Sequence, residues 1–247
     1  MVCLSKVLVR PCFRPSKQDR FFKAGSAWQV PLFSWAGQGG ELAARFPAMR
    51  ICGLTGGIAT GKSTAGRILK KHAEGLAFFD SDECVQGLLK ERGVLEEISE
   101  ALRERVTTTD GSLDRSKLRE IVFTAPKKRE ALEGVLHPKV RKECLEKRDK
   151  SSKNPSTTLF VADVPLLFES GFDFDQELNL VVATSEATQR IRLRARSHFE
   201  DRMITSILKA QLPIMEKVAR GEVVFWNEGS PSILERQLIR FLHSLKI

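Results

Sequence analysis

The chain has 247 residues, of which 42% are hydrophobic and 29% are charged, and its formal net charge at pH 7 is +9. These proportions are typical of a globular protein. No apolar run approaches the roughly 20 residues that a membrane-spanning helix needs, so we expect no membrane span. The five cysteines form no C-x-x-C pair, which argues against a zinc site or a disulfide framework.

The first 48 residues differ in composition from the rest of the chain. They contain seven Lys or Arg and two acidic residues, so they carry more than half of the net charge. A nucleic-acid-binding protein concentrates its excess charge on the folded part, so no nucleic-acid partner is expected. A basic, acid-poor segment without a persistent apolar period predicts a disordered N-terminal extension or an organellar transit peptide. We therefore expect a mitochondrial or other organellar protein if residues 1–48 are a transit peptide, and a cytoplasmic one otherwise.

The folded part is expected to begin near Met49 and to alternate strands with helices over residues 49–247. This alternation predicts the α/β class: a parallel, five-stranded sheet flanked by helices. In chain order we expect strand Arg50–Leu54, helix Ser63–His72, strand Leu76–Phe79, a mainly helical stretch from Glu83 to Lys150, strands Leu159–Ala162 and Asn179–Ala183, helices Glu186–Arg196 and Glu200–Val218, strand Val223–Trp226, and helix Pro231–Leu245.

The stretch 83–150 is too long for a simple crossover between two strands. We expect a small helical subdomain that leans over the carboxyl edge of the sheet. The loop Thr107–Ser112, which contains Asp110-Gly111, is predicted to break the helical pattern once. Pro138 is predicted to kink it.

A G-x-x-x-x-G-K-[ST] motif spans Gly56 to Ser63 and lies between a predicted strand and a predicted helix. In this motif backbone N–H groups and the helix N-terminus hold the phosphates of ATP. The motif therefore indicates that the predicted sheet is of the P-loop NTPase type. Lys62 would reach the β- and γ-phosphates, and the Ser63 hydroxyl would bind Mg²⁺. The alternative is a Gly-rich turn without a ligand. The expected ATP-binding residues of this loop are Gly56, Gly57, Ile58, Ala59, Thr60, Gly61, Lys62, Ser63 and Thr64.

Acidic residues end two of the predicted strands. Asp80 and Asp82 follow the second strand, and Asp163 follows the third. Ligands of open α/β sheets bind at the carboxyl ends of strands, where a carboxylate could orient an attacking hydroxyl group. The position of Asp163 is that of a Walker-B acid, which binds Mg²⁺ directly or through water. The alternative is that these acids only cap the helices that follow.

A run of arginines extends from residue 190 to residue 202. Within it, Arg192 and Arg196 are four residues apart and would share one face of a helix. Arginines can stabilise the charge of a transferring phosphoryl group. The alternatives are a solvated surface and an RNA-binding one. His137 has no metal-ligand companions, and a structural role is the alternative to a chemical one.

With these motifs in place, the sequence resembles the dephospho-CoA kinase family over about residues 49–245. The P-loop alone is shared by many nucleotide enzymes, whereas the ordered set of motifs is much more specific. The matching segments are Leu54–Ile58, Asp80-x-Asp82, Leu113–Arg115 with Leu118 and Val122-Phe123, Leu132-Glu133, His137-Pro138-x-Val140-Arg141, Asp163–Glu169, Gln189 with Arg192 and Arg196, Gln211-x-Pro213 with Lys217, and Asn227.

This resemblance implies transfer of a phosphoryl group from ATP to the ribose 3′-hydroxyl of dephospho-CoA, which gives CoA and ADP. It implies that residues 83–150 bind CoA, that residues from about 192 to 203 form a lid, and that Asn227 lies near the adenine of ATP. The implied catalytic residues are Asp82, Lys62, Arg196 and Arg192, the substrate-binding residues are Asp80, Asp82, His137, Pro165 and Leu166, and the metal ligands are Ser63 and Asp163.

Two other functions remain open from the sequence. One is another small-molecule or nucleoside kinase on the same scaffold. The other is a catalytically silent protein that binds nucleotide or RNA. The expected partners are ATP and dephospho-CoA, and a monomer is expected, with a small oligomer as the alternative.

Overall fold

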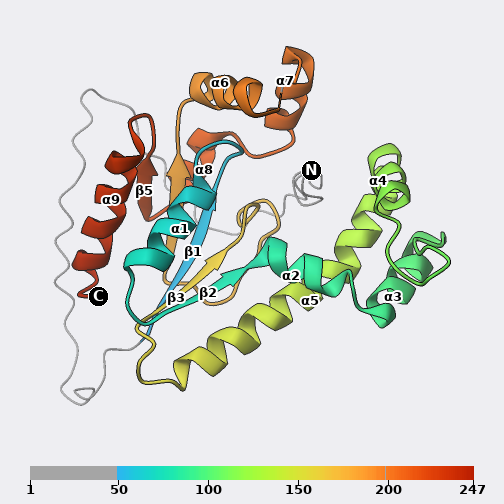
Figure 1. Ribbon diagram of the computed structural model, residues 1–247, viewed down its shortest axis with the longest axis horizontal. Helices are drawn as coiled ribbons and strands as arrows, with labels where there is room; N and C mark the ends of the chain where they lie inside the picture. The colour runs from blue at the N-terminus through green and yellow to red at the C-terminus, as the bar shows by residue number, and fades with distance from the viewer. Residues whose placement is uncertain (1–48, 198) are drawn as a thin grey trace.

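The computed structural model describes residues 49–197 and 199–247, and the predicted extension over residues 1–48 lies outside this part. The described residues form one five-stranded sheet in which every paired neighbour is parallel, in the order β2-β3-β1-β4-β5 (Figure 1). The predicted α/β class and all five predicted strands are therefore confirmed. The strands are β1 Arg50–Gly56, β2 Leu76–Asp80, β3 Leu159–Asp163, β4 Leu178–Ala183 and β5 Val223–Trp226.

Both faces of the sheet are covered by helices. Helices α1 (Lys62–His72) and α9 (Pro231–Ser244) pack against each other and bury one face, where Cys52 and Leu54 of β1 belong to the core. Phe160 and Ala162 of β3 lie in the core of the other face, together with residues of the four helices between β2 and β3. Two-sided burial explains why the inner strands β3 and β4 are continuous apolar runs rather than alternating ones.

Residues 81–152 form an arm of four helices. Its last and longest helix packs along β2 and β3, while the two middle helices lie away from the sheet (Figure 1). The arm confirms the helical stretch, but its helices are separated near residues 89–91 and 125 as well as across the predicted loop. The first helix begins at Ser81, two residues before the prediction, because the Asp80 carboxylate caps it by accepting from the N–H groups of Asp82 (2.9 Å) and Glu83 (3.1 Å). The helices are α2 Ser81–Leu88, α3 Arg92–Leu102, α4 Arg115–Thr124 and α5 Pro126–Ser152, and α5 runs through Pro138 without a break.

The segment after β4 contains α6 (Glu186–Ser197), α7 (Asp201–Lys209) and α8 (Ile214–Arg220). The prediction of one helix over Glu200–Val218 is wrong, because the chain leaves the helix after Lys209 and starts a new one after Pro213. Proline lacks an amide hydrogen and disfavours helical geometry at the residue before it. Pro213 has φ −49° and ψ 139° and is the N-cap of α8.

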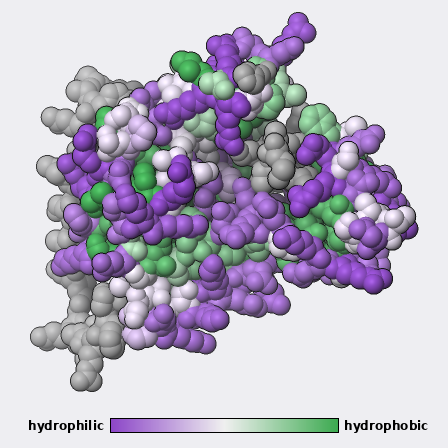
Figure 2. All heavy atoms as spheres, viewed as in Figure 1, coloured by the Kyte–Doolittle hydropathy of each residue, from purple (hydrophilic) through white to green (hydrophobic). Residues whose placement is uncertain are grey.

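The surface is mostly hydrophilic on the face seen in Figure 2, where hydrophobic residues gather only in small separate patches. Phe123 and Ile191 are among the exposed large hydrophobic residues, each 62% exposed. In the part of the chain that the structure describes, no helix is long and apolar enough to cross a membrane.

Candidate active site

The carboxyl ends of β1, β2 and β3 meet at one edge of the sheet. Because β3 pairs in parallel with both neighbours, Asp163 lies level with Leu54 of β1 and with Asp80 of β2. The loop that follows β1 is the predicted P-loop. Three segments that are far apart in the sequence therefore bring the phosphate-binding motif and the acidic residues together, as the motifs predict.

The P-loop turns from β1 into α1 through residues in the left-handed region of backbone space. Ala59 has φ 61° and Gly61 has φ 99°. The Thr60 hydroxyl donates to the carbonyl of Gly57 at 2.8 Å and stabilises the turn. Among the described residues, no side chain caps the N-terminus of α1, so its N–H groups and positive dipole end are directed at the loop. This arrangement is suited to binding an anion such as a phosphate group.

Lys62 donates a hydrogen bond to the Asp163 carboxylate, and both side chains are largely buried. Burial raises the pKa of Asp163, while the Lys62 charge opposes that shift and the charges of Asp80 and Asp82 add to it. The Ser81 hydroxyl donates to the Asp163 carbonyl at 2.9 Å and holds the start of α2 against β3. The structure thus places the predicted phosphate ligand, the predicted metal ligand and the predicted catalytic carboxylate in one charged cluster.

Arg192 and Asn227 hold the P-loop from outside. The Arg192 guanidinium donates to the carbonyls of Ala59 (3.2 Å), Thr60 (3.4 Å) and Asn227 (2.8 Å). The Asn227 amide donates to the Thr60 carbonyl at 2.8 Å, and its side chain lies directly over Gly61. Arg196 lies one turn further along α6 and is exposed. Of the two predicted arginines, therefore, Arg192 contacts the nucleotide loop and Arg196 faces solvent.

A pocket next to the charged cluster is mainly apolar and lies between α2, α5 and the loop after β3. Four predicted site residues, Asp82, His137, Pro165 and Leu166, line it. Glu133 also lines it, and in the described part of the chain its buried Oε1 atom has no hydrogen-bond partner. Burial raises the pKa of Glu133. The sequence analysis gave Glu133 no role, although its spacing of four residues from His137 puts both on one face of a helix.

A second group of residues behind the P-loop was named in the motif set without a role. The Gln189 amide donates to the Ile58 carbonyl at 2.7 Å, and the Ile58 N–H donates to the Gln211 side-chain oxygen at 2.9 Å. Lys217 and Glu169 form an ion pair of 2.7 Å whose side chains are 0% and 1% exposed. Lysine and glutamate are rarely buried so completely, so the sequence alone gave no reason to place them inside.

A metal site made only of protein side chains is absent from the described residues, because they contain no group of three or more His, Cys, Asp or Glu that could hold an ion. Mg²⁺ in kinases is usually held by one or two protein groups together with substrate phosphates and water. Ser63 is exposed at the N-terminus of α1, and Asp163 ends the strand beside it. These two oxygen-bearing side chains fit that pattern.

The family model and the curated relatives that match this chain carry the same description. The sequence model of the family described as dephospho-CoA kinase matches residues 50–232. The dephospho-CoA kinase of Fusobacterium nucleatum is 33% identical over 198 residues, which are 80% of this chain and 100% of that protein. The one of Symbiobacterium thermophilum is 39% identical over 183 residues, or 74% of this chain and 75% of that protein.

Two solved structures resemble the chain in fold. The crystal structure of TT1252 from Thermus thermophilus superposes with a TM-score of 0.65 at 31% identity and covers 80% of this chain and 98% of that one. Dephospho-CoA kinase from Campylobacter jejuni gives a TM-score of 0.60 at 24% identity, covering 79% and 96% of the two chains.

Replacing Gly61 with alanine is expected to weaken ATP binding. A Cβ at this position would lie 2.3 Å from the Asn227 amide nitrogen, and the φ of 99° is unfavourable for alanine. Left-handed geometry costs about 1–2 kcal/mol for a residue with a Cβ, and each ~1.4 kcal/mol changes a dissociation constant tenfold. Isothermal titration with ATP should therefore show a dissociation constant raised about tenfold or more.

The matched control for Gly61→Ala is Gly93→Ala, since Gly93 lies in α3 and a Cβ at this position would meet no other atom within 4 Å. Alanine is the better helix former there, so ATP binding should not change. Unchanged ATP affinity in Gly61→Ala would contradict the assignment of the loop.

Proposed function

We propose the residues by which this chain, which belongs to the dephospho-CoA kinase family, carries out its reaction. The enzyme uses ATP to phosphorylate dephospho-CoA, the final step of CoA biosynthesis. The observation that carries the residue assignment is the position of Asp82, which lines the apolar pocket and also acts electrostatically on Asp163 beside the P-loop. Donor and acceptor sites therefore meet at Asp82.

ATP binds with its phosphates on residues 56–64. Backbone N–H groups of the loop and the N-terminus of α1 hold the phosphates, as the left-handed turn at Gly61 allows. Lys62 turns from Asp163 to the β- and γ-phosphates when the nucleotide brings in its negative charge. Asn227 and Arg192 keep the loop in shape. The family resemblance also puts Asn227 near the adenine of ATP.

Dephospho-CoA binds in the pocket between the helical arm and the loop after β3. Asp82 orients its ribose 3′-hydroxyl in line with the γ-phosphate and takes up the proton of that hydroxyl. His137, Pro165 and Leu166 form the walls of the pocket. Asp80 supports Asp82 from the N-cap position of α2, where its carboxylate accepts the Asp82 N–H. The arm over residues 83–150 is thereby the CoA-binding subdomain.

Mg²⁺ would be held by the Ser63 hydroxyl and the Asp163 carboxylate. When bound, the ion neutralises charge on the β- and γ-phosphates of the nucleotide. The buried position of Asp163 keeps that carboxylate directed at the loop, and Lys62 balances its charge.

Chelation of divalent ions should therefore abolish phosphoryl transfer while leaving the fold unchanged, which circular dichroism would show.

Residues from about 192 to 203 form the lid, which comprises the end of α6 and the start of α7. Closure excludes water and so favours transfer over hydrolysis of ATP. Arg192 is already held at the P-loop, whereas the exposed Arg196 is free to swing toward the transferring phosphoryl group and stabilise its charge.

The change Asp82→Asn should lower the turnover number for CoA formation by at least about a hundredfold, because the amide cannot accept the proton of the 3′-hydroxyl. The KM for ATP should remain close to that of the unchanged enzyme, since Asp82 lies on the acceptor side. Steady-state assays of the full chain with ATP, Mg²⁺ and dephospho-CoA, with CoA detected by mass spectrometry, measure both quantities.

Glu83→Gln is the matched control for Asp82→Asn. It removes a carboxylate from the next residue of α2, which is exposed, and should leave turnover unchanged. Near-full turnover in Asp82→Asn would overturn the role of this residue, and a panel of nucleoside and sugar acceptors that all outperform dephospho-CoA would overturn the choice of acceptor.

The proposal also covers the cellular compartment of the enzyme and its oligomeric state. Residues 1–48 act as a transit peptide to a mitochondrion or another organelle, on the strength of their basic, acid-poor composition. The enzyme works as a monomer in this proposal, with a small oligomer as the alternative. A fluorescent reporter fused to residues 1–48 should enter an organelle, whereas a diffuse cytosolic signal would contradict targeting. Light scattering should give the mass of a single chain.

A further inference from the structure

Lys217 and Glu169 form a buried ion pair next to the P-loop. Glu169 lies in the loop after β3, and Lys217 lies in α8. Their charged atoms are 2.7 Å apart, and both side chains are almost completely excluded from solvent. Burial lowers the pKa of the Lys217 ammonium, and the Glu169 carboxylate opposes that shift.

The Lys217 ammonium contacts one residue of each proposed substrate site. It donates to the carbonyl of Pro165 at 3.0 Å, and its nitrogen is 3.5 Å from the carbonyl of Gly56. Pro165 lines the acceptor pocket, and Gly56 is the first residue of the P-loop motif. The Thr55 hydroxyl donates to the same Pro165 carbonyl at 3.1 Å. One cation therefore contacts the donor site and the acceptor site at the same time.

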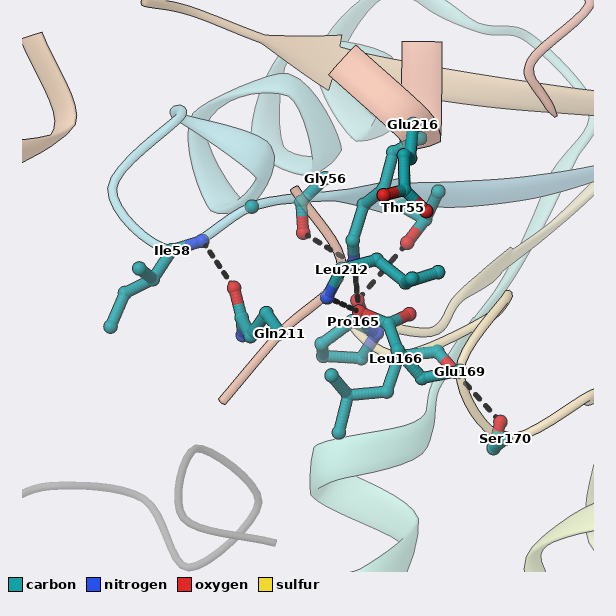
Figure 3. A network of polar contacts seen from close by, with 12 residues as sticks. Thr55, Gly56, Ile58, Pro165, Leu166, Glu169, Ser170, Gln211, Leu212 and Glu216 are labelled. Atoms are coloured by element: carbon teal, nitrogen blue, oxygen red, sulfur yellow. Dashed lines mark hydrogen bonds and ion pairs between the residues drawn. The ribbon is translucent and has the colours of Figure 1, made fainter. Parts of the chain in front are cut away.

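The Glu169 carboxylate extends this connection to the segment that follows the lid. Its Oε1 atom accepts the N–H of Leu212 at 3.1 Å in addition to the Lys217 ammonium. The neighbouring Gln211 accepts the N–H of Ile58 in the P-loop at 2.9 Å. Figure 3 shows these contacts side by side. One network of polar contacts therefore joins the segment after the lid, the P-loop and the loop that carries Pro165.

Stability alone does not account for this pair. A buried ion pair can often be exchanged for apolar residues of similar size without loss of stability, because desolvation of the charges offsets their attraction. In the described part of the chain, the Glu169 Oε2 atom is buried without a hydrogen-bond partner, which adds to that cost. What an apolar pair cannot supply is a directed donor for two backbone carbonyls.

We propose that Lys217 and Glu169 are positioning residues that fix the P-loop relative to the acceptor wall, and thereby the distance between the γ-phosphate and the acceptor hydroxyl. This inference rests on the proposed function, because it requires the two sites assigned above. A displacement of about 1 Å between reacting groups can reduce a rate about a hundredfold. A loosened network should therefore leave ATP bound but misaligned, so that water competes with the acceptor for the phosphoryl group.

The test uses three variants of the full chain. Lys217→Met removes the ammonium while keeping most of the side-chain length. The double change Lys217→Met with Glu169→Gln also removes the unpaired buried charge and keeps an oxygen for the Leu212 N–H. Lys71→Met is the matched control, since Lys71 is 70% exposed and pairs with Glu235 at the surface, 3.2 Å away. The measurements are CoA and ADP formed from ATP, Mg²⁺ and dephospho-CoA, and unfolding by denaturant.

Lys217→Met should lower CoA formation about tenfold or more and raise the amount of ADP formed per CoA. The double variant should regain stability but keep the raised ADP-to-CoA ratio, and Lys71→Met should match the unchanged enzyme. If Lys217→Met does not fold, the double variant carries the test. Recovery of both stability and the original ratio in the double variant would overturn the inference and leave a purely structural pair. Failure of the unchanged enzyme to form CoA would instead overturn the proposed function.

Discussion

The parallel pairing of β3 with both β1 and β2 fixes the level at which three loops leave the sheet. Asp163 is paired with Leu54 on one side and with Asp80 on the other. A shift of either strand by one residue would turn its side chains to the opposite face and move the acid away from the P-loop. The apolar side chains of β3 are fully buried and prevent such a shift. The chemistry of the edge thus depends on the packing of the core beneath it.

The described side chains at this edge of the sheet carry more negative than positive charge. Lys62 pairs with Asp163, and Asp80 and Asp82 add negative charge nearby. Phosphate groups would compete with Asp163 for Lys62. Once Lys62 binds a phosphate, the Asp163 carboxylate becomes available to a metal ion. The same acids that would repel a free nucleotide therefore favour one that arrives with Mg²⁺. Arg192 donates to P-loop carbonyls and to the Asn227 carbonyl, so it acts on this edge through the shape of the loop.

The sequence predicted those parts of the molecule that depend on short-range patterns. The five strands are apolar runs, and the Gly56–Ser63 motif needs only its own residues and a strand and helix on either side. The break at Pro213 was missed because polar and apolar residues continue a helical period across it. Arg192 was predicted to stabilise the transferring phosphoryl group, from its spacing to Arg196 and from the family resemblance. Its contacts with the P-loop carbonyls depend instead on where α6 packs. The pairing of Lys217 with Glu169 joins a loop and a helix that only the tertiary fold brings together.

A crystal structure of the full chain with dephospho-CoA and a non-hydrolysable ATP analogue tests the central assignment most directly. The Asp82 carboxylate is expected to lie within about 2.6–3.2 Å of the ribose 3′-hydroxyl. The Lys62 ammonium is also expected to have moved from Asp163 to a phosphate oxygen. A 3′-hydroxyl bound away from Asp82, or a Lys62 that stays on Asp163 while the phosphates lie elsewhere, would contradict this assignment.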